Sequence, residues 1–178
     1  MKDRLIVVSN HLFATTHVKF PGDIVVRVNL AWLKDTKTAI ATLGKIKHAI
    51  YLDYPQGRSK PPRPTITLSE ALQMATMFKN IKYFAVSNVE KPEKIAKIRS
   101  RLPAHIELVP KIESKKGVEH LPGIMKSAKS RCAMLDKEDL YTNVGCKMKP
   151  YEKLIKDARA HAKKSGFKLI ELQGVVFA

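Results

Sequence analysis

Residues 106–135 read IELVPKIESKKGVEHLPGIMKSAKSRCAML. The two apolar runs at 106–112 and 132–135 are typical of buried β-strands, and the segment 118–127 between them has helical spacing. A strand, a helix and a second strand in this order predict a βαβ unit, in which the two strands are parallel and the crossover is right-handed.

The same alternation continues along nearly the whole chain. Helix borders carry the expected signals, such as the capping box Thr67-Leu-Ser-Glu70. Strands are predicted at residues 5–9, 24–30, 49–53, 83–87, 106–112, 132–135 and 169–172, and helices at 36–46, 68–78, 92–102, 118–127 and 151–164.

Two arrangements fit such a series, namely an open doubly wound sheet and a (β/α) barrel. The turn after the first strand, Ser9-Asn-His-Leu-Phe-Ala14, lacks the glycines of a dinucleotide or phosphate loop. Polar residues stand instead at the ends of several strands, and in a barrel these ends converge on the catalytic face. The predicted fold is therefore α/β, a TIM-type barrel with a parallel sheet.

The length of 178 residues suits one domain, expected over residues 1–178. A complete eight-unit barrel takes about 250 residues. We therefore expect an incomplete barrel of about seven βα units, whose open sheet edges a second copy covers in a homo-oligomer.

The composition limits the classes of partner. The chain has 33 Lys and Arg against 16 Asp and Glu, a formal net charge of +17, which favours anionic partners. A nucleic acid is the less favoured partner, because no basic stretch with interleaved aromatic residues occurs. The sequence also lacks an apolar run of bilayer length and a cleavable leader, so we expect a cytoplasmic protein without membrane contact.

The clearest chemical signal is Val109-Pro-Lys-Ile-Glu113, followed one helix later by Met134-Leu-Asp-Lys-Glu-Asp-Leu140. Lys111 and Glu113 are two apart on a strand and share a face, where burial is costly unless they are paired. Asp139 ends the next strand, so two carboxylates could hold Mg²⁺ or Mn²⁺. The alternative is a buried Lys–Glu pair that only fills the barrel mouth.

These motifs, in this order, resemble the barrel domain of pyruvate kinase, within the phosphoenolpyruvate/pyruvate domain superfamily. Upstream, Arg27-Val-Asn-Leu30 is similar to the second-strand Arg-Leu-Asn-Phe of that family, and the segment from Leu52 to Arg58 is similar to its third-strand Leu-Asp-Thr-Lys-Gly. Order and spacing agree over nearly the whole chain.

The resemblance implies roles for individual residues. Glu113 and Asp139 would bind Mg²⁺ (or Mn²⁺), Lys111 would stand beside the transferred phosphoryl or enolate oxygen, and Arg27 would clamp a substrate phosphate. Glu138 replaces a glycine near the substrate carboxylate. Half of the family's potassium site would be present, formed by Asn29 and Asp53. The other half is missing, because Ala31 and Tyr54 replace a serine and a threonine, so a K⁺ site is doubtful.

The family's lid domain and its C-terminal regulatory domain have no counterpart in this sequence. In place of the lid, a proline-rich loop at 55–64 carries Arg58, Lys60 and Arg63, which we interpret as a clamp for an anion at the barrel mouth. The alternative is a solvated turn with an incidental group of basic residues.

Three functions remain open at this point. The first is pyruvate kinase-like chemistry on phosphoenolpyruvate or pyruvate, with stabilisation of an enolate. The second is a Mg²⁺-dependent aldolase or lyase of the citrate lyase β or HpcH/HpaI type, which the lone small barrel resembles and which acts on a small anionic oxoacid. The third is a non-catalytic oligomeric barrel that binds an acidic partner or nucleic acid.

Overall fold

The computed structural model describes residues 7–9, 24–57 and 61–171, and the chain forms two compact units. The first unit comprises residues 1–85 and 101–107, and the second comprises residues 86–100 and 108–178. Each unit is treated by itself. The single domain over 1–178 and the homo-oligomer expected from the sequence stay predictions.

The first unit alternates strands and helices, as the sequence predicts. Its elements are β1 (Val7–Ser9), β2 (Val25–Asn29), the 3-10 helix η1 (Leu30–Trp32), α2 (Thr36–Lys45), β3 (Ala49–Tyr54), α3 (Leu68–Met77) and β4 (Ile81–Val86), whose last residue belongs to the second unit. β1 pairs with β2 and β2 with β3, all in parallel. Val26, Val28, Ile50 and Leu52 are fully buried, as expected for parallel strands covered on both faces.

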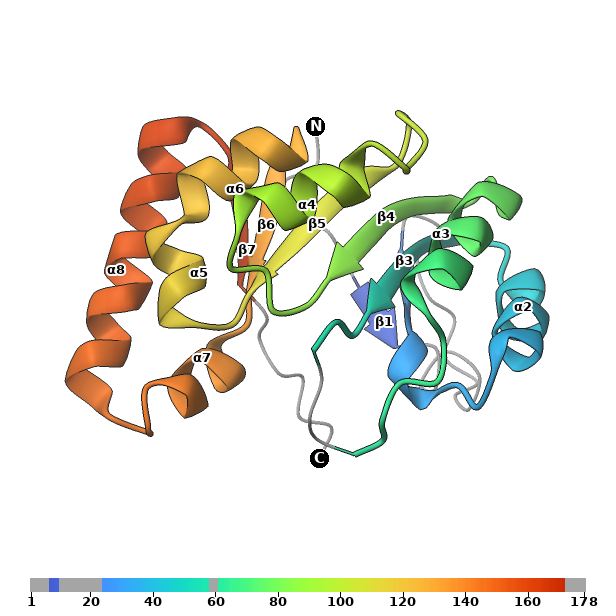
Figure 1. Ribbon diagram of the computed structural model, residues 1–178, viewed down its shortest axis with the longest axis horizontal. Coiled ribbons are helices and arrows are strands. Elements are labelled where there is room, and N and C mark those ends of the chain that lie inside the picture. Colours follow the sequence, from blue (N-terminus) through green and yellow to red (C-terminus); the bar gives the residue numbers. More distant parts are fainter. Residues whose placement is uncertain (1–6, 10–23, 58–60, 172–178) are drawn as a thin grey trace. The chain divides into compact units, whose positions relative to one another are not determined.

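The second unit repeats the pattern with more helices. Its elements are α4 (Pro92–Arg99), β5 (Glu107–Ile112), whose first residue belongs to the first unit, α5 (Lys115–Glu119), α6 (Leu121–Ala128), β6 (Cys132–Leu135), α7 (Lys137–Asn143), α8 (Met148–Ser165) and β7 (Lys168–Glu171). β5 pairs with β6 and β6 with β7, again in parallel. Helix α4 packs against α6 and α6 against α8, beside these strands (Figure 1). The predicted α/β class and the incomplete barrel with parallel strands are confirmed.

Two helical predictions need correction. The helix predicted at 118–127 is two helices, α5 and α6, which meet at His120, where the backbone leaves the helical region (φ −95°, ψ 4°). Pro122 explains the break, because it has no N–H to continue α5 but suits the first turn of α6. Helix α7 was not predicted. It begins after Asp136, whose side chain caps it, and Glu138 and Asp139 favour its first turn.

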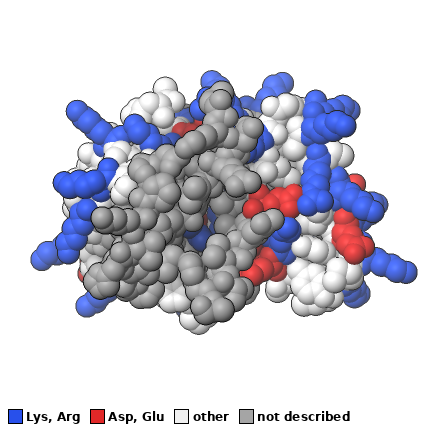
Figure 2. Space-filling model, turned by 180° about the vertical axis from the view of Figure 1, so that it is seen from behind, with Lys and Arg blue, Asp and Glu red and all other residues white. Residues whose placement is uncertain are grey.

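The surface is strongly basic. Figure 2 shows Lys and Arg side chains in excess over Asp and Glu on the face in view. On α8, the exposed positions include Lys149, Lys153, Lys156 and Arg159. No helix within the described ranges is both long and apolar enough to cross a membrane.

Candidate metal centre

The end of β5 brings two charged side chains into the interior of the second unit. Lys111 lies on β5 and Glu113 directly follows it, and each is only 5% exposed. The two residues are separated by the apolar Ile112, so the strand alternation predicted from the sequence turns both side chains to the same face.

Lys111 is held by three oxygen-bearing side chains. Its Nζ donates a hydrogen bond to Oγ of Ser87 at 3.1 Å. The same nitrogen lies 2.9 Å from Oε1 of Glu113 and 3.7 Å from Oδ2 of Asp136. The ammonium group is therefore fixed among anionic and polar oxygens, away from bulk water.

Glu113 is only partly satisfied by its surroundings. The backbone N–H of Asn88 donates to its Oε2 at 3.0 Å, from a residue in the left-handed region (φ 52°). Its other oxygen, Oε1, is buried and accepts no hydrogen bond from the described residues, because the Lys111 contact is close but poorly aligned. Burial raises the pKa of Glu113, and Asp136 adds to the rise, whereas Lys111 and the Asn88 N–H oppose it.

Two further carboxylates come from the start of α7. Asp136 is the N-cap of this helix, and its Oδ1 accepts a hydrogen bond from the backbone N–H of Asp139. The N–H of Asp136 in turn donates to the carbonyl of Ile112 at 3.1 Å, which ties the helix start to β5. Oxygen atoms of Glu113, Asp136 and Asp139 all lie within 4.8 Å of one another.

This donor set fits a hard divalent cation. Oxygens on opposite sides of Mg²⁺ are about 4 Å apart, so three oxygens within 4.8 Å need only small shifts to share one ion. A buried carboxylate oxygen without a hydrogen bond is costly, and a cation would remove that cost. Glu113 and Asp139, the pair predicted from the sequence, are thus brought together with Lys111.

The first unit contains another charge pair, in which Asp53 is buried and Arg27 is half-buried. Nε of Arg27 donates to Oδ2 of Asp53 at 2.9 Å, and its terminal nitrogen also contacts that oxygen. Asn29 is the register partner of Asp53 on the adjacent strand, but its Oδ1 accepts from the N–H of Ala31 and caps η1. The substrate-binding and catalytic roles expected of Arg27, Asn29 and Asp53 stay predictions.

Three other site residues were predicted from the sequence, and the structure describes one of them, Glu138. Glu138 lies in the first turn of α7, rather than at a strand end, and its side chain is exposed. Arg58 and Lys60 lie outside the described residues. Substrate binding by these three residues stays a prediction.

Sequence reasoning assigned no specific role to three contributors, namely Ser87, Asn88 and Asp136. Asp136 directly follows a buried strand and precedes the acidic pair Glu138 and Asp139, which is the signature of a helix N-cap. Ser87 also ends a predicted strand. No sequence signal marks Asn88, because its contribution is a backbone N–H placed by a left-handed turn.

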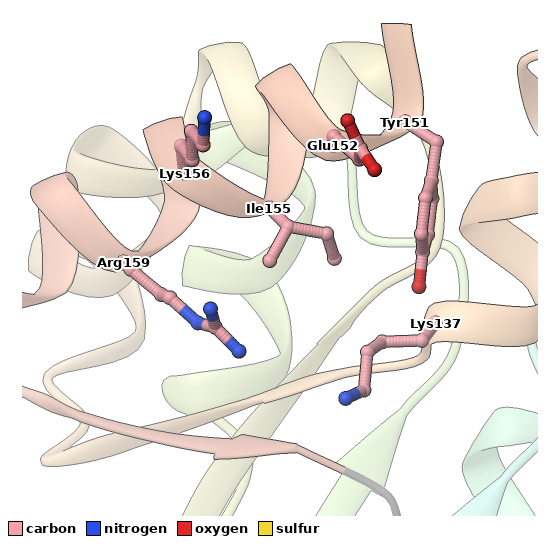
Figure 3. A pocket seen from close by; sticks show the side chains of 6 residues that line it. All are labelled: Lys137, Tyr151, Glu152, Ile155, Lys156 and Arg159. Atoms are coloured by element: carbon pink, nitrogen blue, oxygen red, sulfur yellow. The ribbon is translucent and has the colours of Figure 1, made fainter. Parts of the chain in front are cut away.

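A surface pocket lies elsewhere in the second unit, between α7 and α8. Figure 3 shows Lys137 and Arg159 extending toward the same region, beside Tyr151 and Ile155. Arg159 donates two hydrogen bonds to Glu171, at 2.7 and 2.9 Å, and Lys137 lies 3.0 Å from the same carboxylate. These cations are thus already bound by an acid of the chain.

Comparison with known proteins gives one match in sequence and many in structure. No family profile matches the chain. A pyruvate kinase of Thermotoga maritima is 31% identical over 108 residues, which cover 59% of this chain but only 23% of that enzyme. The chain therefore corresponds to less than a quarter of the pyruvate kinase that it matches.

The similar structures cover almost the whole chain. A HpcH/HpaI aldolase/citrate lyase family protein from Burkholderia cenocepacia has a TM-score of 0.68 at 12% identity, covering 96% of this chain and 80% of its own. The citrate lyase β subunit from M. tuberculosis, complexed with oxaloacetate and magnesium, has a TM-score of 0.64 at 11% identity, covering 94% and 76%. At these identities the likeness establishes the fold. The resemblance to pyruvate kinase is thus confirmed in sequence over part of the chain, and the resemblance to the aldolase/citrate lyase branch is confirmed for the fold.

Proposed function

We propose that this protein is a Mg²⁺-dependent enzyme that cleaves a carbon–carbon bond in a small anionic oxoacid. The observation that carries the proposal is the buried Glu113 oxygen without a hydrogen bond, grouped with two further carboxylates beside a buried lysine. Glu113 and Asp139 would hold the ion. When bound, it would supply Lewis-acid stabilisation of the negative charge that develops on an oxoacid oxygen.

Lys111 would add a second positive charge to the same centre. It is 5% exposed and held in place by Ser87, so its ammonium group needs little reorganisation when negative charge develops nearby. Its burial also keeps water away from this charge, which strengthens electrostatic interactions there.

Bond cleavage is favoured over phosphoryl transfer by the third strand and its connection. β3 ends at Tyr54 and α3 begins at Leu68, so no lid domain is inserted there. Nucleotide-dependent phosphoryl transfer depends on closure that excludes water. The structures that match over most of their own length include an aldolase/citrate lyase family protein and a citrate lyase β subunit with magnesium.

The direct test is pyruvate release from a 4-hydroxy-2-oxoacid, measured with and without Mg²⁺. We expect release to require the metal, to stop with a chelator and to fall at least a hundredfold in Glu113→Gln. Glu119→Gln is the matched control, because it removes an exposed carboxylate from α5. Metal-independent release, or unchanged release by Glu113→Gln, would contradict the proposal.

A second candidate is phosphoryl transfer between phosphoenolpyruvate and ADP. It is favoured by the 31% identity to a pyruvate kinase over 108 residues. Mg²⁺-dependent formation of ATP and pyruvate from phosphoenolpyruvate and ADP, without activity on hydroxy-oxoacids, would replace the first proposal with this one.

A further inference from the structure

Helix α8 carries a row of lysines on the side that faces away from the rest of the second unit. The helix packs on α5, α6 and β7 (Figure 1), and its buried residues are Leu154, Ile155, Ala158 and Ala162. Because an α-helix has about 3.6 residues per turn, residues spaced by three, four or seven positions share a face. Four exposed lysines with this spacing lie opposite the buried residues, and we call them the lysine stripe: Lys149, Lys153, Lys156 and Lys163.

The lysine stripe has only one sign of charge. At a rise of about 1.5 Å per residue, it extends over about 21 Å of the helix. The acids of α8, Glu152 and Asp157, lie on either side of the stripe, and none of its four lysines forms an ion pair within the described part of the chain. Elsewhere in the unit, exposed charges do pair, as Lys115 and Glu119 do on α5.

Helix stability does not explain this arrangement. Lys149 and Lys153 are four residues apart, and Lys153 and Lys156 are three apart, so that like charges are neighbours and repel each other. Lys149 also lies in the first turn of α8, where the positive end of the helix dipole disfavours a cation. A solvated helix face usually alternates the two signs. An anion bound along the stripe would relieve these repulsions.

We propose that the lysine stripe binds the phosphate backbone of double-stranded nucleic acid, without regard to base sequence. A duplex has one phosphate per about 3.4 Å along each strand, so a stripe of about 21 Å spans the phosphates of about six base pairs. Lysines that neutralise phosphates release counterions, and such contacts carry no sequence information. The inference does not depend on the proposed reaction, because no residue of α8 belongs to the carboxylate cluster.

The composition of the stripe favours a duplex over other polyanions. Protein interfaces are depleted in lysine and depend on aromatic and arginine side chains, which the stripe lacks. Single-stranded nucleic acid is bound largely by stacking on aromatic residues. A helix that binds a membrane surface inserts its apolar face, but Leu154 and Ile155 of α8 are buried in the unit.

The test is the fluorescence anisotropy of a labelled DNA duplex of about 20 base pairs, titrated with the full chain at several salt concentrations. The stripe variant carries Lys149→Gln, Lys153→Gln and Lys156→Gln, which remove charge and keep helix propensity. We expect it to bind at least about tenfold more weakly at low salt. The slope of log affinity against log salt should fall by about 2.7, because three phosphate contacts are lost.

The matched control removes the same charge from other helices of the unit. It carries Lys94→Gln, Lys97→Gln and Lys126→Gln, at exposed positions of α4 and α6. It should bind within about twofold of the unaltered chain, because net charge alone does not make the stripe. Arginine at the three substituted stripe positions conserves the charge and should conserve the affinity.

The inference is overturned if the chain does not bind the duplex, if salt does not weaken binding, or if the control loses as much affinity as the stripe variant. Loss of binding in the arginine variant would overturn it as well. Tighter binding of a single strand of the same length, of phosphatidylserine vesicles or of polyglutamate would assign the stripe to another class of polyanion, and would also overturn it.

Discussion

The two units bury charge in opposite ways. In the first unit, Arg27 and Asp53 set one positive charge against one negative charge. In the second, Lys111 contacts two members of a group of three carboxylates. Burial of charge is costly in both places, and one cation contacts one carboxylate in the first unit but two carboxylates in the second.

This difference indicates which of the two sites would gain stability from a bound cation. A buried ion pair with matched charges can be purely structural, whereas an excess of buried carboxylates costs free energy until a cation arrives. The predictions below test this contrast between the Arg27–Asp53 pair and the carboxylate cluster.

The largest effect is expected from Arg27→Met. It leaves the carboxylate of Asp53, whose side chain is 2% exposed, without its guanidinium partner, and should lower the free energy of unfolding by about 3 kcal/mol. Asp53→Asn should cost less, because the side chain of Arg27 is 24% exposed and can reach water. Urea denaturation of the three proteins measures both values. If both substitutions lower the free energy of unfolding equally, the unpaired buried carboxylate of Asp53 is not the main cost.

A smaller effect is expected from Gly117→Ala in the second unit. A Cβ at this position would lie 2.9 Å from the carbonyl oxygen of Val89 and 3.2 Å from the side chain of Ile112. We expect Gly117→Ala to lower the free energy of unfolding by about 2 kcal/mol, because the added Cβ would force packed backbone to move. The shift should also weaken Mn²⁺ binding, because Ser87 and Asn88 on the same turn contact Lys111 and Glu113.

Gly123→Ala is the matched control for that substitution. Its Cβ would lie 3.1 Å from the ring of Pro92, on α4 and not beside the carboxylates. Mn²⁺ affinity should stay unchanged. Weaker Mn²⁺ binding by Gly123→Ala than by Gly117→Ala would show that the turn at residues 87–89 does not organise the cluster.

The pH dependence of folding stability in the metal-free protein tests what it costs to bury the charged form of Glu113. Because its pKa is raised in the folded state, its contribution to stability is greatest below the ordinary pKa and is lost as the pH rises through the folded pKa. Glu113→Gln should remove this loss, so with a chelator present its stability should change less between pH 5 and pH 8 than that of the unaltered chain. Thermal unfolding between pH 5 and pH 8 measures the difference, and parallel curves would contradict it.

The smallest effect is expected at the exposed cluster around Glu171. Arg159 and Lys137 hold the pKa of Glu171 at about 2, against an ordinary value of 4.5. Its stabilisation is therefore present above about pH 4.5 and is lost as the pH falls toward 2. Since Arg159 is largely exposed, Glu171→Gln should cost no more than about 0.5–1 kcal/mol at pH 7 and nothing near pH 2, by urea denaturation.

The sequence predicted the helices and strands that have strong local signals. The capping box at Thr67 and the apolar strands around Arg27 and Lys111 have their counterparts in α3, β2 and β5. The helix α7 was missed because it is short and its main signal is one capping residue, Asp136. The break at His120 was missed because helical spacing continues across it, although Pro122 is visible in the sequence.

The sequence alone also determined the chemistry available at the end of β5. Alternation along a strand is a local property, so the shared face of Lys111 and Glu113 follows from their spacing of two. Only the tertiary structure decided that Asp136, and not Glu138, joins Glu113 and Asp139, because this depends on where α7 begins. The Asn88 N–H likewise reaches Glu113 through a turn between two elements. Charge balance in a buried site is set by such long-range contacts, which local sequence patterns do not encode.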